Sequence, residues 1–98
     1  MAIESFRCRE TQNLFLGKRV ARFRNIEASA MRKLAMLHRV VNVKELGIPP
    51  SNRLEALKGD RKGQWSVRIN DQWRLCFRFS SGRALDVEIV DYHRKRIP

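Results

Sequence analysis

The sequence has few of the residues that build disulfide frameworks, metal centres or cofactor sites. Its two cysteines, Cys8 and Cys76, lie far apart, and it has only two histidines. Two isolated thiols exclude a disulfide-rich scaffold. A zinc site is also not expected, because neither cysteine has a second cysteine near it in the sequence. No glycine-rich phosphate loop follows a predicted strand. We therefore expect no metal and no cofactor.

Long hydrophobic runs are missing as well. No apolar segment approaches the roughly 18 residues that a membrane-spanning helix needs, and Ile3 to Phe6 is too short for the core of a signal peptide. With its thiols reduced, the chain is predicted to be cytoplasmic and to have no membrane partner.

Acidic residues are scarce compared with basic ones. The chain has 21 lysines and arginines against 10 aspartates and glutamates, a formal net charge of +11, and the excess is spread over both halves. Such a charge is typical of proteins that bind nucleic acid, and it also suits an acidic protein partner. The 98 residues, 43% of them hydrophobic, are enough for one domain, 1–98, with a modest core.

The first half of the chain predicts helices. A weakly alternating segment at 3–8 suits a short first strand, and a helix follows from near Glu10. Apolar residues then recur at spacings of three and four over 26–41, which predicts an amphipathic helix with Asn25 as its N-cap. The residues of its apolar stripe are Met31, Leu34, Leu37 and Val41. The glycine and adjacent prolines of 47–52 end the helical half.

The second half predicts strands, because apolar and polar residues alternate there in four segments. The segments are 53–58, 65–70, 73–80 and 85–89. A turn flanked by glycines, 59–63, separates the first two. Half-buried antiparallel strands joined by hairpins are the expected arrangement. Helices followed by strands predict a fold of the α+β class.

Parity predicts the register of the first hairpin. Directly opposed residues share a face, so the apolar faces match only if Ile69 opposes Trp73 across a three-residue loop, 70–72. Arg68 then becomes the cross-strand neighbour of Arg74 on the face away from the helices. The same test allows a loop centred on Gly82 in the next hairpin.

The last strand ends irregularly. Its inward series would continue from Ile89 to Asp91 and His93, while Tyr92 takes the other side. Either the strand leaves the core at Asp91, or a bulge flips the faces there. Both are common beside active sites because they re-aim side chains.

These residues together suit RNA cleavage without a metal. That reaction needs a base for the ribose 2′-hydroxyl, cations for the pentacoordinate phosphorane and an acid for the leaving oxygen. Aromatic faces can hold the bases beside the reacting phosphate. The cations available are Lys58, Arg68, Arg74 and Arg78, and Asp91 and His93 can titrate. The same arginines also suit a merely solvated strand face.

The order of the segments resembles the HigB toxins, which are RelE-like ribosome-dependent mRNA interferases. The resemblance covers residues 1–93 and is carried by 53–61 (RLEALKGDR), 63–67 (GQWSV), 70–75 (NDQWRL) and 88–93 (EIVDYH). It implies a RelE-like microbial RNase fold, with two or three N-terminal helices packed on a curved antiparallel β-sheet. It also implies mRNA cleavage in the ribosomal A site and neutralisation by a HigA-type helix-turn-helix antitoxin. Operator DNA would be bound only through the complex with that antitoxin.

The resemblance also implies the site residues. Positions used for catalysis in the family match Lys58, Arg74, Asp91, Tyr92 and His93, and hairpin parity adds Arg68 as a phosphate contact. The expected RNA-binding set is completed by Arg61, Arg78 and Arg94. This chain departs from the pattern at Glu55, where many relatives have a histidine, so Glu55 is a further candidate base. It also continues as a short basic extension, 94–98.

The resulting hypothesis is acid–base transesterification that yields a 2′,3′-cyclic phosphate, with Asp91 or His93 as the base. Lys58 and Arg74 would stabilise the phosphorane. Two alternatives remain open from the residues: a non-catalytic RNA- or ribosome-binding module, and a component that docks an acidic protein. Only the enzyme should cut ribosome-bound mRNA.

Overall fold

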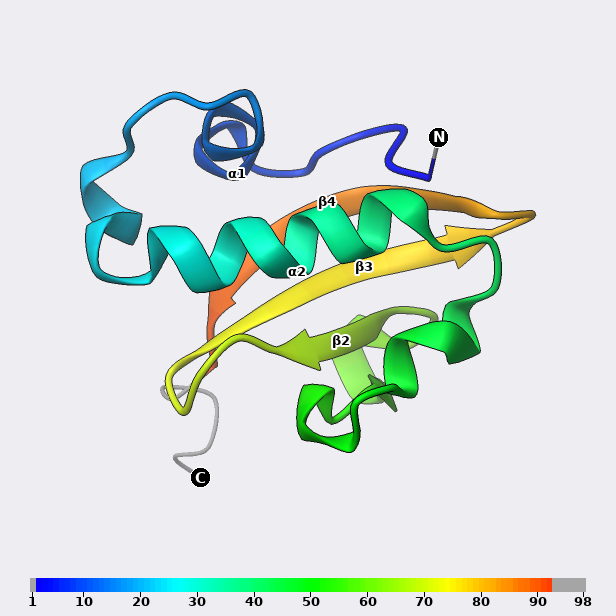
Figure 1. Cartoon of the computed structure of the whole chain (residues 1–98). Coiled ribbons are helices and arrows are strands. Elements are labelled where there is room, and N and C mark those ends of the chain that lie inside the picture. The colour runs from blue at the N-terminus through cyan, green and yellow to red at the C-terminus, as the bar shows by residue number, and fades with distance from the viewer. Residues whose placement is uncertain (1, 93–98) are drawn as a thin grey trace.

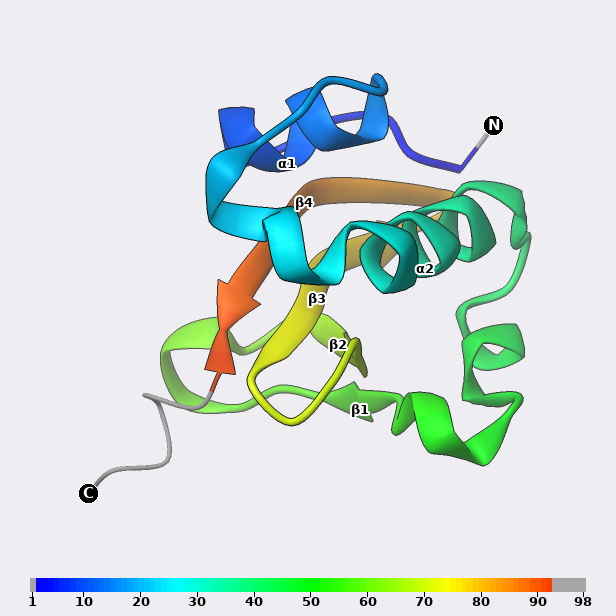
Figure 2. The ribbon, with the colours of Figure 1, turned by 60° about the vertical axis from the view of Figure 1, so that its left-hand side comes forward.

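The computed structural model describes residues 2–92 and has an α+β architecture, as predicted. Four antiparallel strands form one sheet in the order β1-β2-β3-β4, and two α-helices lie on one of its faces (Figure 1). A second view shows how strongly β3 and β4 bend, which agrees with the expected curvature (Figure 2). The bounds are α1 Arg9–Phe15, α2 Glu27–Arg39, β1 Glu55–Ala56, β2 Trp65–Arg68, β3 Trp73–Ser80 and β4 Arg83–Asp91.

The N-terminal segment lies along the outer edge of β4 but does not form a strand of its own. It makes two isolated parallel bridges, Ile3 with Ala84 and Phe6 with Val87. Between them Asp86 adopts a left-handed conformation, with a φ of 53°, and its amide donates to the Ser5 hydroxyl at 2.9 Å. This irregularity interrupts the ladder, so the predicted first strand is replaced by two separate contacts.

The start of α2 differs from the prediction. A 3-10 helix, η1 (Ala21–Ile26), runs directly into it, and Ile26 stands at the N-cap without a side-chain cap. Ile26 is only 6% exposed, so burial fixes this end and the predicted Asn25 cap is wrong. The predicted apolar stripe is correct at Leu34 and Leu37, both fully buried. Val41 lies beyond the end of the helix and is 76% exposed.

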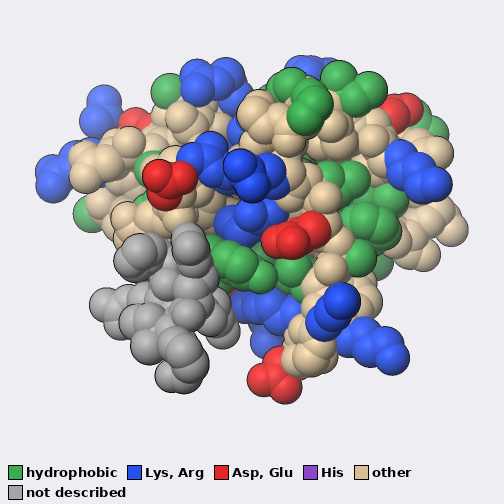
Figure 3. Space-filling view, turned by 90° about the horizontal axis from the view of Figure 1, so that it is seen from below, with side chains coloured by type: hydrophobic (Ala, Val, Ile, Leu, Met, Phe, Trp, Pro, Cys, Tyr) green, Lys and Arg blue, Asp and Glu red, His purple; other side chains and the backbone are tan. Residues whose placement is uncertain are grey.

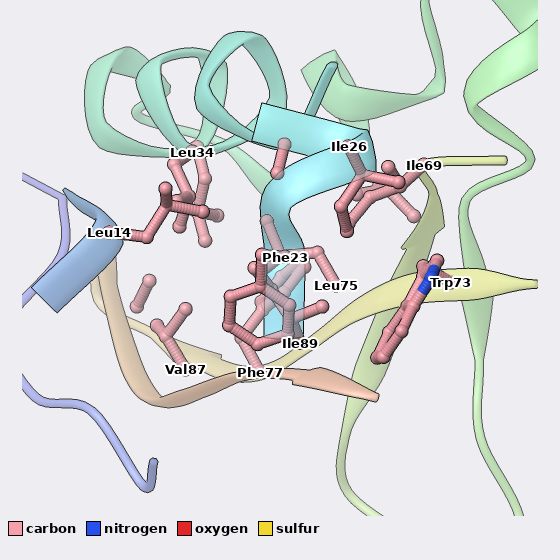
Figure 4. Packing of buried hydrophobic residues seen from close by; sticks show 14 of the residues in the cluster. Leu14, Phe23, Ile26, Leu34, Ile69, Trp73, Leu75, Phe77, Val87 and Ile89 are labelled. Atoms are coloured by element: carbon pink, nitrogen blue, oxygen red, sulfur yellow. The ribbon is translucent and has the colours of Figure 1, made fainter. Parts of the chain in front are cut away.

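The core lies between the helical layer and the sheet. Phe23 is fully buried and meets the Trp73 ring edge-on, with 5.5 Å between ring centroids. Figure 4 shows these two rings beside Leu75, Phe77 and Ile89, residues of β3 and β4. The helical layer therefore packs against β3 at Trp73, the residue that precedes Arg74 in the chain.

Two short 3-10 helices, η2 (Val43–Gly47) and η3 (Pro50–Asn52), connect the helices to the sheet. The fully buried Asn52 fastens this connection: its side-chain amide donates to the Leu46 carbonyl at 3.0 Å and its oxygen accepts from Lys33 Nζ at 2.6 Å. Arg53 follows with a φ of 48°, which turns the chain into β1. The loop before β1 is thus tied to α2.

The first hairpin has the predicted register. Arg68 opposes Arg74, and the Ile69 amide donates to the Trp73 carbonyl at 2.9 Å across the three-residue loop. The Asn70 side-chain oxygen accepts from the Gln72 and Trp73 amides at 2.9 and 2.8 Å. An Asx-type turn of this kind satisfies the loop backbone locally.

The second hairpin differs from the prediction. Ser80 opposes Arg83, which leaves a two-residue turn, Ser81–Gly82, with φ values of 51° and 77°. Two residues with positive φ match the twist of antiparallel strands. The register shifts by one residue between Cys76 and Arg78, where Asp86 has its positive φ. The bulge therefore lies near the middle of β4 and not at Asp91, where the strand ends.

Neither α-helix within residues 2–92 is long and apolar enough to cross a membrane.

Candidate active site

Arg74 is a firmly held charged side chain on the face of the sheet away from the helices. Its Nε donates to the Ser66 hydroxyl at 2.9 Å, and its Nη2 donates to the Arg53 carbonyl at 2.6 Å. Its guanidinium carbon lies 5.3 Å from the centroid of the Tyr92 ring, and the residue is only 9% exposed. A cation fixed from three sides is preorganised to stabilise negative charge.

Arg68 and Arg74 lie directly opposite each other on β2 and β3. Like charges in opposed positions destabilise a sheet. Each has an anionic neighbour: Arg68 pairs with Asp71, and Arg74 Nη2 lies 3.5 Å from the Glu55 carboxylate. These two carboxylates are 95% and 53% exposed, so water screens much of their charge. The pair of arginines therefore keeps much of its attraction for an anion.

A pocket of about 480 Å³, here called the arginine pocket, opens beside these side chains. It is lined by Ser51, Arg53, Arg68, Asn70, Asp71, Arg74 and Tyr92. In the space-filling view from below, lysine and arginine side chains gather near the centre of the face, with acidic groups on both sides (Figure 3).

A second pocket of about 190 Å³, here called the lysine pocket, lies on another side of Tyr92. It is lined by Leu57, Lys58, Asp60, Arg61 and Tyr92. Arg61 belongs to the 3-10 turn η4 (Gly59–Arg61) and donates to the side chains of Gln64 at 2.9 Å and Glu88 at 3.0 Å. These bonds tie the turn that carries Lys58 to β4.

The structure brings most of the predicted site residues to one face. Arg68 and Arg74 line the arginine pocket, and Glu55 lies beside Arg74. Lys58 and Arg61 line the lysine pocket, and Tyr92 lines both pockets.

Four predicted residues lie elsewhere or cannot be placed. Asp91 opposes Trp73, so it lies on the helix-facing side at the end of β4, where it accepts from Gln72 Nε2 at 3.2 Å. Arg78 lies further along β3 and pairs with Asp86 at 3.5 Å. His93 and Arg94 lie outside the described residues.

Two basic residues beside the arginine pocket were missed in the sequence. Arg53 lines it, and Lys33 of α2 donates to Asn52, which lies in the chain between Ser51 and Arg53 of the pocket lining. Burial, followed by the charges of Arg32 and Arg68, lowers the pKa of Lys33 below its usual value. The helical spacing in the sequence places Lys33 off the apolar stripe of α2. Its position near Arg68 depends on the packing of η3 on α2, which the sequence does not show.

Within residues 2–92, no three His, Cys, Asp or Glu side chains are grouped so that they could hold a metal ion.

Residues 15–93 match the family described as RelE-like toxin of type II toxin-antitoxin system HigB. The chain belongs to this family. Toxin HigB-1 of Vibrio cholerae is 41% identical over 70 residues, which is 71% of this chain and 73% of that protein. Endoribonuclease HigB of Proteus vulgaris is 44% identical over 41 residues, 42% of this chain and 45% of that protein. This HigB-like chain is therefore the toxin of a type II toxin–antitoxin system.

Solved structures of other toxins share the fold. YafQ from E. coli strain BL21(DE3) superposes with a TM-score of 0.63 over 97% of both chains, at 13% identity. The YoeB/ParE toxin from Agrobacterium tumefaciens has a TM-score of 0.50 over 92% of this chain and 99% of that one, at 20% identity. At this identity the similarity concerns the fold, which is RelE-like.

Proposed function

We propose that this HigB-like toxin is an endoribonuclease that cuts mRNA in the ribosomal A site by metal-independent acid–base transesterification. The observation that carries the proposal is the position of Arg74. It is buried, held by Ser66 and the Arg53 carbonyl, and it contacts the aromatic ring that lies between two cationic pockets. The name of the Proteus vulgaris relative supports the same activity.

In this mechanism Arg74 of the arginine pocket and Lys58 of the lysine pocket stabilise the charge that develops on the phosphorane, and Tyr92 lines both pockets. The Tyr92 ring holds a base of a splayed RNA strand against its face. A general base removes the proton of the 2′-hydroxyl, and the 2′-oxygen bonds to phosphorus. As the bond from phosphorus to the 5′-oxygen breaks, a general acid protonates that oxygen, which yields a 2′,3′-cyclic phosphate and a 5′-hydroxyl.

Of the two candidate general bases, Asp91 lies within the described residues and His93 lies outside them. Asp91 lies on the face opposite Arg74 and is held by Gln72. We therefore assign Asp91 a positioning role at the end of β4 and assign the base to His93, on the strength of its match to the family's catalytic position.

The proposed partners follow from the family and the charge. We propose a HigA-type helix-turn-helix antitoxin, with operator DNA bound only through the antitoxin complex, and a cytoplasmic location with access to ribosomes. The net charge of +11 suits both the ribosome and an acidic segment of the antitoxin.

Expression of the chain without its antitoxin tests the activity. We expect growth arrest and new mRNA 5′ ends within coding regions, measured by primer extension, and relief of both by co-expression of the antitoxin. Growth arrest without new 5′ ends would favour the non-catalytic ribosome-binding alternative. No effect of either kind would overturn the proposal.

Replacing Glu55 by glutamine should strengthen RNA binding about twofold to fivefold, because it removes a half-exposed carboxylate that competes with phosphate for Arg74. We expect cleavage to persist. The measurement is RNA affinity by fluorescence anisotropy, together with the cleavage rate, and Glu4→Gln is the matched control because Glu4 pairs with the remote Arg83. Loss of cleavage with intact binding would instead make Glu55 the general base.

A further inference from the structure

The arginine pocket contains more positive charge than one reacting phosphate requires. Arg53, Arg68 and Arg74 line it, and the Arg74 guanidinium already lies against Tyr92 at the boundary with the lysine pocket. Arg53 and Arg68 therefore remain as a second pair of cations within the same pocket.

The carboxylates near these cations do not neutralise their positive charge. Asp71, which pairs with Arg68, is 95% exposed, and Glu55, which lies 3.5 Å from Arg74 Nη2, is 53% exposed. Lys33 adds a further positive charge, held near the pocket by its bond to the buried Asn52. The pKa of Lys33 is lowered first by burial and then by the charges of Arg32 and Arg68, so Lys33 lies close enough to Arg68 to interact with its charge. Such an arrangement is stabilised when an anion binds.

The size of the pocket fits a nucleotide better than an isolated anion. Its volume of about 480 Å³ falls within the range of pockets that enclose small organic ligands, about 300–1,000 Å³. The lining combines cations for a phosphate, the Asn70 amide and the Ser51 hydroxyl for polar edges, and the Tyr92 ring for a base.

We propose that the arginine pocket binds the nucleotide next to the cleaved bond and that Arg53 and Arg68 bind its phosphate. Arg74 and Lys58 are left for the phosphate that reacts. Tyr92 lines both pockets, so one RNA strand passes from one pocket to the other across its ring. This inference rests on the proposed function, because it divides that site into two phosphate subsites. The ligand class is a ribonucleotide unit with a phosphate on each side of its sugar.

Arg53 and Arg68 can be replaced without dismantling the catalytic subsite. Arg53 contributes its carbonyl, not its side chain, to the bond with Arg74, and the pair that Arg68 makes is with exposed Asp71. The double variant Arg53→Gln/Arg68→Gln therefore keeps the anchors of Arg74. The matched control, Arg24→Gln/Arg83→Gln, removes the same charge from exposed positions in η1 and at the start of β4.

The test compares the affinity of the purified chain for a nucleoside 3′,5′-bisphosphate and for the corresponding 3′-monophosphate, by titration calorimetry. We expect the wild-type chain to bind the bisphosphate about tenfold more tightly. The double variant should lose this preference while its monophosphate affinity is unchanged, and the control should keep it. Equal affinities in the wild-type chain, or a full preference in the double variant, would overturn the proposal.

Cleavage assays separate this result from the proposed function. With ribosome-bound mRNA, the double variant should show a KM raised about tenfold at nearly unchanged kcat, because the second phosphate contributes binding and not chemistry. The wild-type chain could prefer the bisphosphate and yet cut no mRNA. That result would contradict the proposed function but would still support a nucleotide-binding pocket. An active wild-type chain without the preference would contradict only the second subsite.

Discussion

Replacement of Arg74 by methionine is expected to lower kcat for mRNA cleavage about a hundredfold to a thousandfold. The reason is that Arg74 is held by three contacts: the Ser66 hydroxyl, the Arg53 carbonyl and the Tyr92 ring. A charge that is already oriented stabilises the phosphorane without reorganisation at the moment of reaction. Single-turnover cleavage of ribosome-bound mRNA measures the effect.

Arg74→Lys sharpens this test. Lysine keeps the charge but lacks the planar fork that meets Ser66 and Arg53 together, so we expect it to restore little of the lost activity. Arg83→Gln is the control, because Arg83 is 61% exposed and pairs with Glu4 at the other end of β4. Activity of Arg74→Met within tenfold of the wild-type chain would show that Arg74 is not central.

Replacement of Phe23 by alanine should lower the free energy of unfolding by about 3–5 kcal/mol. Phe23 is fully buried between the helical layer and the sheet, and its ring meets Trp73 edge-on. The truncation leaves a cavity and removes the aromatic contact, and a domain of this size has only about 5–15 kcal/mol of stability in total. Urea unfolding followed by far-UV circular dichroism measures the change.

The control for Phe23→Ala is Leu16→Ala. Leu16 lies just after α1 and is 61% exposed, so its truncation should change the free energy of unfolding by less than about 0.5 kcal/mol. A Phe23→Ala variant as stable as the control would contradict the described packing of η1 on the sheet.

Local patterns predicted the parts of the fold that depend on neighbouring residues. Alternation located β2, β3 and β4, and parity placed Arg68 opposite Arg74, because a one-residue slip would turn one apolar face of the hairpin to water. The family resemblance added Lys58 and Tyr92, and the structure places both beside pockets on that face.

Features that depend on tertiary packing could not be predicted. A bulge at Asp86 shifts the register within β4, so parity alone could not distinguish the turn at Ser81–Gly82 from a longer loop. Burial of Ile26 overrides the capping preference of Asn25 at the start of α2. Arg53 takes part in the site because its backbone turns at a φ of 48°.

The most direct test of the account uses purified ribosomes that hold an mRNA with a defined codon in the A site. The wild-type chain should produce new 5′ ends within that codon, and the upstream fragment should carry a 2′,3′-cyclic phosphate. Without ribosomes, or with Arg74→Met, these ends should be missing. The same ends made by Arg74→Met, or no ends made by the wild-type chain, would contradict the claim that this arginine-centred site cuts mRNA.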